Sequence, residues 1–230
     1  MRRIIKMIPN TITCLNVLCG CIAVMFAFSG FLEGSFIMIL LAAVFDFLDG
    51  FAARLLKAYS PMGKELDSLA DMISFGLAPA AIVYVMGAEY IAFLIAIFSA
   101  LRLAKFNIDE RQTTEFIGLP TPANALFFGA LGYVYFVREP WYLFQVIENE
   151  YVLIGLVVVF SLLLVSEIRM FSLKFKSFKF KDNILKFSFL AASLALIIVF
   201  KIASFPMIIL LYVLISIIRH IVTPKASENS

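Results

Sequence analysis

The sequence predicts an all-α membrane protein: a polytopic helical bundle of about eight transmembrane helices, forming a single integral-membrane domain over residues 1–230. Three observations predict this class. Hydrophobic residues make up 63% of the chain and charged residues only 15%, and the mean hydropathy is +1.00, whereas a soluble domain is roughly half apolar. The apolar residues gather in runs long enough to cross a bilayer. The basic residues gather at the ends of those runs.

A bilayer-crossing helix needs about 20 mostly apolar residues, and eight segments of the chain approach this length. The first follows a basic stretch, as a signal peptide would, but Asn and Thr residues interrupt its early part and favour a retained membrane helix. The expected helices are 10–31, 35–56, 66–87, 90–106, 120–137, 151–168, 187–201 and 205–221.

The longest polar connections between these helices are 107–119 and 169–186. The second alternates Phe with Lys along much of its length. This pattern fits an amphipathic segment lying beside anionic lipid, and it fits a plain basic loop equally well.

The basic residues predict the orientation of the bundle. With a cytoplasmic N-terminus and eight crossings, all but two of the 19 Lys and Arg residues fall on the cytoplasmic side, the exceptions being Arg138 and Lys201. Cytoplasmic loops carry such an excess. We therefore expect both termini in the cytoplasm and a multi-pass protein of the cell membrane. The basic residues form no single face, so we expect no nucleic-acid partner.

Four aspartates fall within the apolar sequence: Asp46 and Asp49 on the second predicted helix, and Asp67 and Asp71 on the third. A short turn joins these helices at the cytoplasmic side. Because a helix advances 100° per residue, each helix directs its two carboxylates along one face. A pairing of Asp49 with Arg54, or a favourable first-turn position for Asp67, would explain one aspartate. Neither explains four at membrane depth, where charge is costly.

Four facing carboxylates would repel one another unless divalent cations neutralised them. Oxygen ligands suit Mg²⁺, Mn²⁺ or Ca²⁺ and argue against zinc, and two ions about 3.5–4 Å apart would clamp a phosphoryl centre. Gly50, Ala53 and Gly63 lie beside the carboxylates and leave room for a bulky group. Arg54 and Lys64 add positive charge for phosphate oxygens. The residues therefore indicate metal-assisted phosphoryl chemistry.

The spacing of these residues resembles the signature of the CDP-alcohol phosphotransferase family. Every fixed position is present in Asp46-x2-Asp49-Gly50-x2-Ala53-Arg54-x8-Gly63-x3-Asp67-x3-Asp71. The resemblance covers most of residues 1–140, which would form the motif-bearing catalytic core, while 141–230 would add further C-terminal transmembrane helices. It implies transfer of a phosphatidyl-type group from a CDP-linked lipid to an alcohol, release of CMP, and a homodimer.

The resemblance also implies a site for two divalent cations, Mg²⁺ or Mn²⁺ with Ca²⁺ as another option. Its ligands would be Asp46, Asp49, Asp67 and Asp71. Asp71 would in addition be the general base that takes the proton from the acceptor hydroxyl. The residues agree with a carboxylate base, because the one histidine, His220, lies at the end of the last predicted helix, where we expect an interfacial residue.

A CDP-lipid site on the first three helices is implied as well. Its residues would be Gly50, Ala53, Arg54, Gly63, Lys64 and Asp67. The stretch "IPNTITCLN" (Ile8–Asn16) resembles the segment that precedes the motif in this family, which would bring Asn10 and Thr13 to the nucleotide. Alternatively, Asn10 simply caps the first helix after Pro9.

The stretch "RLAKFNIDERQTTEFIGLPTPANA" (Arg102–Ala125) is similar to a segment of the serine-accepting branch of the family, the integral-membrane phosphatidylserine synthases. The matching positions are Arg102, Phe106, Asn107, Gly118, Leu119, Pro120 and Pro122. Because a carboxylate pairs with Arg or Lys, we expect Arg102, Lys105 and Asn107 to bind L-serine. Snorkelling of Arg102 and Lys105 to the membrane interface is the alternative.

The lipid donor would be CDP-diacylglycerol or CDP-archaeol, between which the sequence does not choose. Two other functions stay open. The same chemistry could use glycerol 3-phosphate or an inositol phosphate as acceptor. A cation-coupled transporter would also place acids in the membrane, but transporters usually show inverted repeats and broken helices at the midplane, and no repeat is visible in the sequence.

Overall fold

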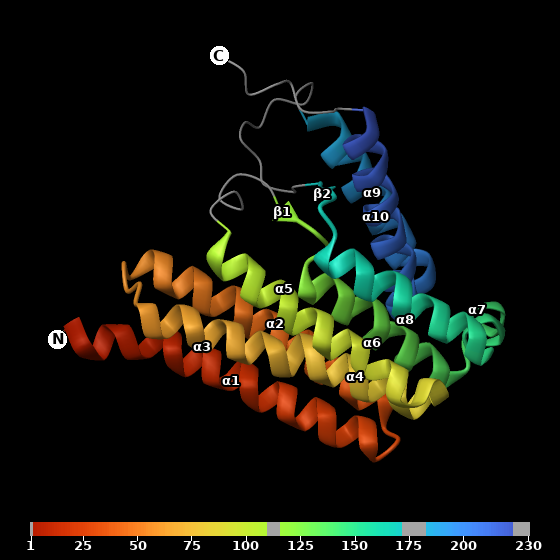
Figure 1. Ribbon diagram of the computed structural model, residues 1–230, viewed down its shortest axis with the longest axis horizontal. Helices are drawn as coiled ribbons and strands as arrows, with labels where there is room; N and C mark the ends of the chain where they lie inside the picture. Colours follow the sequence, from red (N-terminus) through yellow and green to blue (C-terminus); the bar gives the residue numbers. More distant parts are fainter. Residues whose placement is uncertain (1, 110–115, 172–182, 223–230) are drawn as a thin grey trace.

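The computed structural model describes residues 2–109, 116–171 and 183–222, and helices dominate it (Figure 1). The longer α-helices are α1 (Arg2–Phe28), α2 (Leu32–Leu55), α3 (Pro61–Asp71), α5 (Leu94–Ile108), α6 (Thr121–Val137), α8 (Glu150–Val165), α9 (Ile184–Phe200) and α10 (Ser204–Val222). Each predicted apolar segment corresponds to one of these helices or to a continuous run of shorter ones.

The hairpin of α1 and α2 forms one edge of the bundle in Figure 1. The tight turn between the two helices uses Gly30, whose φ of 79° is a conformation that glycine adopts without steric cost. Ser35 at the start of α2 donates a hydrogen bond of 2.7 Å to the Ala23 carbonyl of α1. The first helix begins at Arg2 rather than at residue 10, so the capping role considered for Asn10 is wrong.

The third and fourth predicted helices follow one another as helical segments without a loop between them, with a kink near Gly87. After α3 come η1 (Met72–Leu77), α4 (Ala78–Val83), η2 (Tyr84–Ala88) and η3 (Glu89–Phe93), followed by α5. The run begins five residues earlier than predicted, because Ser60 caps it: its side chain accepts a hydrogen bond from the Gly63 N–H. Positive φ angles at Gly87 and Glu89 break the run. A π-helical turn follows Asp71 directly, and π-turns are frequent at functional sites.

A short strand pair, which the sequence did not predict, joins the two long connections of the chain. β1 (Phe116–Ile117) pairs antiparallel with β2 (Arg169–Met170), with Ile117 opposite Arg169. The short helix α7 (Trp141–Ile147) before α8 was also not predicted. Of the Phe/Lys-rich segment 169–186, residues 172–182 lie outside the described part of the chain, so neither interpretation of that segment is tested.

The last two helices form a hairpin whose ribbons run steeply across the direction of the other helices in Figure 1. A 3₁₀ turn, η6 (Lys201–Ala203), connects α9 to α10. At this turn Phe205 packs edge-on against Phe36 of α2, with ring centroids 5.7 Å apart. The opposite end of α10 lies beside β2, so α10 runs from one end of the bundle to the other.

The apolar exterior identifies a membrane protein. Among the described residues, four helical runs are long and apolar enough to cross a membrane, namely Met7–Phe28, Leu32–Leu55, Pro61–Ile108 and Ile184–Val222. A fifth results if α7 and α8, bent by 80°, form one span. Large side chains such as Phe47, Ile198 and Val199 are more than half exposed, as expected where lipid rather than water covers the surface.

Candidate metal and nucleotide site

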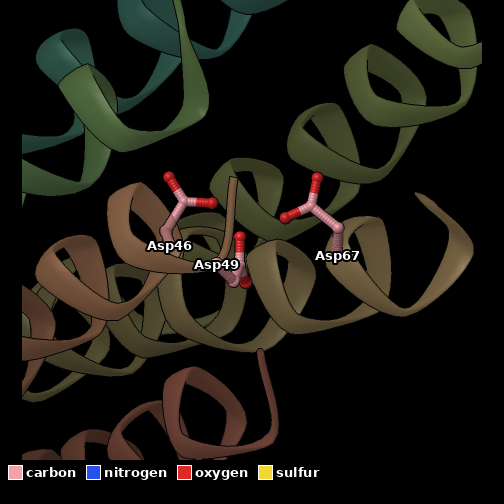
Figure 2. A group of neighbouring side chains, drawn as sticks. All are labelled: Asp46, Asp49 and Asp67. Carbon is pink, nitrogen blue, oxygen red and sulfur yellow. The ribbon is translucent and has the colours of Figure 1, made fainter. Parts of the chain in front are cut away.

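Three of the four aspartates meet between α2 and α3. Asp46 and Asp49, one helical turn apart on α2, face Asp67 of α3, and one carboxylate oxygen from each lies within 4.8 Å of the others. Figure 2 shows the three carboxylates turned towards the space between these helices. The structure thus brings the carboxylates of Asp46 and Asp49 on α2 and of Asp67 on α3 together, as the two facing helices predict.

The fourth aspartate, Asp71, lies one turn further along α3 and is not part of this group of three. Its carboxylate interacts electrostatically with those of Asp46 and Asp67 and with the Arg102 guanidinium. Its Oδ1 atom is buried and has no hydrogen-bond partner among the described residues. Asp71 is thus close both to the carboxylates of the cluster and to a buried cation.

The donor set of the cluster fits a divalent cation. Three carboxylates within ligand distance of a common point supply the hard oxygen ligands that Mg²⁺, Mn²⁺ or Ca²⁺ prefer. Asp49 is buried, and its Oδ2 atom, like Oδ1 of Asp71, has no partner in the described residues. A buried carboxylate oxygen normally has a partner, and a bound cation would provide one.

A cavity of about 540 Å³ opens beside the cluster. Its walls come from the first three helices and the turn between α2 and α3: Pro9, Asn10, Thr13, Asp49, Gly50, Ala53, Ala58, Tyr59, Ser60, Pro61, Gly63, Lys64 and Asp67. The cavity is therefore lined by every residue predicted to contact the CDP-lipid except Arg54. The Arg54 guanidinium lies close by, because a Cβ atom on Gly50 would be 4.0 Å from its Nη2.

The two motif glycines keep this cavity open in different ways. A Cβ atom on Gly63 would lie 3.1 Å from Oδ1 of Asn10 and 3.1 Å from Oγ of Ser60, so a side chain there would crowd α1. At Gly50 the nearest atom is the Arg54 nitrogen, so the glycine faces open space. Sequence reasoning missed Tyr59, Ser60 and Pro61 as wall residues, although the Ser-Pro pair signals a helix start at this turn.

The residues predicted to bind serine do not form one cluster. Arg102 is buried, its Nη1 donates a hydrogen bond of 3.0 Å to Oγ1 of Thr121 on α6, and its guanidinium lies 5.6 Å from the Phe106 ring centroid. Nε of Arg102 has no hydrogen-bond partner among the described residues. Because Arg102 is buried beside Asp71, the alternative of snorkelling to the interface is wrong for this residue.

Lys105 and Asn107 serve other contacts in the structure. Lys105 forms an ion pair with Glu167, which follows α8. Asn107 donates to Oγ of Ser68 at 2.9 Å and accepts at its carbonyl from Nζ of Lys64 at 3.0 Å. These contacts hold the end of α5 against α3, so Lys64 and Asn107 connect the cavity to the helix that carries Arg102.

A membrane-embedded helical bundle with a carboxylate cluster beside a cavity defines a class: a membrane protein with a candidate metal and nucleotide site. The comparison with known families identifies it further. The chain belongs to the CDP-alcohol phosphatidyltransferase family, whose model matches residues 6–165. This match extends from the first turns of α1 to the end of α8, and it contains the complete aspartate motif and the Arg102–Ala125 stretch.

The chain is also similar to individual proteins, to two of those described here over nearly its whole length. A protein from Methanocaldococcus jannaschii is 35% identical over 226 residues, covering 96% of this chain and 97% of that protein. One from Helicobacter pylori strain J99 is 32% identical over 222 residues, covering 93% and 90%. One from Bacillus subtilis is 36% identical over 135 residues, covering 56% and 76%. Each bears the name CDP-diacylglycerol–serine O-phosphatidyltransferase.

Proposed function

We propose that the protein transfers the phosphatidyl group of a CDP-linked lipid to the hydroxyl of L-serine and releases CMP. The observation that carries this proposal is that Asp71 interacts both with aspartates of the carboxylate cluster and with the buried Arg102. The cluster and its cavity supply a site for the diphosphate and nucleotide, and Arg102 supplies a cation for a serine carboxylate. The names of relatives that match more than nine-tenths of the chain support the choice of serine.

On the donor side, the cavity would hold the cytidine against α1 and the α2–α3 turn. Gly50 and Gly63 allow the nucleotide to approach the backbone, and Asn10, Thr13 and Lys64 line the wall around it. Asp46, Asp49 and Asp67 would hold the cations, with Asp71 contributing to a second ion. Two divalent cations would neutralise charge on the diphosphate and stabilise the departing CMP.

On the acceptor side, Asp71 would accept the proton of the serine hydroxyl as the oxygen attacks the lipid-side phosphorus in line. A new bond forms between the serine oxygen and this phosphorus while its bond to the bridging oxygen of CMP breaks. Arg102 would bind the serine carboxylate, and Thr121 would keep the guanidinium in place through its hydrogen bond. Because Oδ1 of Asp71 is buried, bulk water would compete little with the acceptor hydroxyl at this atom.

We also propose eight crossings with the site facing the cytoplasm. At 1.5 Å per residue the 48-residue run Pro61–Ile108 is about 72 Å long, more than twice the roughly 30 Å hydrocarbon core, and Gly87 and Glu89 divide it. The 39-residue run Ile184–Val222 is divided at Lys201, whose φ is 49°. Counting each run as two spans, with α1, α2, α6 and the α7–α8 pair, gives eight. The basic residues favour a cytoplasmic site.

The experiment that tests the function measures CMP release by the purified protein from CDP-diacylglycerol with Mg²⁺ or Mn²⁺. Serine, glycerol 3-phosphate and an inositol phosphate are added in turn, and an ether-linked CDP-lipid replaces the donor in a parallel series. We expect serine alone to drive release. If another alcohol drove CMP release, serine would be excluded as the acceptor, but the aspartate site would still be supported. If no alcohol drove release with either lipid donor, a transporter would be favoured.

A change of Arg102 to Ala is expected to raise the KM for serine at least about tenfold, because a charge-assisted hydrogen bond contributes roughly 1.5–3 kcal/mol. The KM for the CDP-lipid should stay within about twofold of its original value. Initial rates of CMP release at varied serine and varied lipid give both constants. The matched control is Arg138→Ala, an exposed arginine at the end of α6. If the KM for serine and the KM for the CDP-lipid rose equally, Arg102 would not be a serine-binding residue.

A further inference from the structure

The last helix of the bundle lies beyond residues 6–165, which the family model matches, yet it holds the β2 backbone through two side chains. The Arg169 N–H donates to Nδ1 of His220 at 3.3 Å, and the Phe171 N–H donates to Oγ of Ser216 at 3.0 Å. Ser216 is fully buried and also donates to the Tyr212 carbonyl at 2.7 Å. One face of α10 thus holds the segment 169–171 at two alternate residues.

Aromatic packing strengthens this attachment. The Phe171 ring lies 6.0 Å from the Phe189 ring of α9 and 6.5 Å from the Tyr212 ring of α10. The Arg219 guanidinium stacks over the same ring at 5.5 Å. Phe171 is 3% exposed, so the residue that follows β2 is inserted into the α9–α10 hairpin.

The segment that α10 holds in turn fixes residues 116–119, which precede α6. β2 pairs with β1, the Gly118 N–H donates to the Ile168 carbonyl at 2.9 Å, and the Leu119 N–H donates to the Leu163 carbonyl at 2.9 Å. Gly118 has a φ of +77°, and a Cβ atom there would lie 2.5 Å from the Leu164 carbonyl oxygen. The backbone at 116–119 is therefore held closely against the end of α8 and β2.

Residues 116–119 lead to the residue that orients Arg102. Thr121, the first residue of α6, follows Leu119 by two positions, and its hydroxyl accepts the hydrogen bond from Arg102. One route therefore joins α10 to Arg102, through β2, β1 and Thr121.

We propose that α10 is a positioning element for the acceptor half of the site, and that Ser216 and His220 are positioning residues that fix residues 116–119 and, through Thr121, the orientation of Arg102. This inference rests on the proposed function for its kinetic consequence. Neither residue touches the carboxylate cluster or the cavity, so both act through β2. The α9–α10 hairpin would then serve acceptor selection rather than nucleotide binding.

The kinetic test uses Ser216→Ala and His220→Leu, each of which removes one acceptor for a backbone amide of residues 169–171. Because a neutral hydrogen bond contributes about 0.5–1.5 kcal/mol net, we expect the KM for serine to rise about three- to tenfold in each variant and the KM for the CDP-lipid to change less than about twofold. His220→Asn should restore the serine KM, because its amide oxygen can replace Nδ1 as acceptor. Ser188→Ala is the matched control, since it removes only a hydrogen bond within α9.

Hydrogen exchange of the backbone amides tests how α10 holds the segment 169–171, and it needs no acceptor alcohol. In Ser216→Ala and His220→Leu we expect faster exchange at Arg169, Phe171, Gly118 and Leu119, with exchange in α1 to α3 unchanged. Unchanged exchange at Gly118 and Leu119 would overturn the proposal whichever alcohol is the substrate. Faster exchange with an unaltered serine KM would also overturn it. If no alcohol drives CMP release, the proposed function fails, and exchange alone decides whether α10 fixes residues 116–119.

Discussion

Replacing Asp71 by Asn is expected to lower the rate of CMP release by about a hundred- to ten-thousandfold, the usual contribution of a general base, and to leave CDP-lipid binding intact. Asparagine has the shape of aspartate but cannot accept the hydroxyl proton. The group of three carboxylates that face one another does not include Asp71, so the cation site and the neighbouring cavity should keep most of their ligands. The loss should therefore fall on turnover rather than on binding.

Single-turnover CMP release and calorimetric titration with the CDP-lipid measure these two quantities separately. Glu150→Gln is the matched control, because it makes the same carboxylate-to-amide change at an exposed position on α8. A melting temperature close to that of the unchanged protein shows that the variant folds. Loss of lipid binding together with a large drop in melting temperature would mean that Asp71 is structural.

The geometry of the carboxylate cluster could be predicted from the sequence because it depends on local periodicity. Residues three or four apart share a helix face, which places Asp46 beside Asp49, and a short turn between two helices forces them to lie antiparallel. These two facts bring Asp67 opposite the pair, as the structure shows. The same periodicity could not separate Asp71 from the group, because its setting depends on Arg102, which is 31 positions further along the chain.

The acceptor side was harder to predict because its contacts join segments far apart in the chain. Each strand of the β1–β2 pair has only two residues, too few for an alternating pattern. The ion pair of Lys105 with Glu167 spans 62 positions and the hydrogen bond from Arg169 to His220 spans 51. A sequence pattern identified His220 only as an interfacial residue. Its contact with β2 follows from how α10 packs, which composition and spacing do not determine.

Removal of divalent cations is expected to abolish CMP release, and a change of Asp67 to Asn should reproduce most of that loss. Asp67 is the one member of the cluster from α3, facing Asp46 and Asp49 from α2. Its loss removes the α3 carboxylate that faces Asp46 and Asp49, so the cation held by this group of three would lose its ligand from α3. We expect activity to return when Mg²⁺ or Mn²⁺ is added back to the unchanged protein, and to return poorly in Asp67→Asn even with excess metal.

Binding of Mn²⁺, followed by electron paramagnetic resonance or calorimetry, separates this role from catalysis. We expect Asp67→Asn to weaken Mn²⁺ binding at least about tenfold, as loss of a charged ligand should, and Asp71→Asn to weaken it less, because Asp71 lies outside the group of three. Glu65→Gln, an exposed carboxylate two residues away on α3, is the control. If the two aspartate variants weakened Mn²⁺ binding equally, Asp71 would be an ordinary metal ligand, and its distinct position towards Arg102 would carry no separate catalytic role.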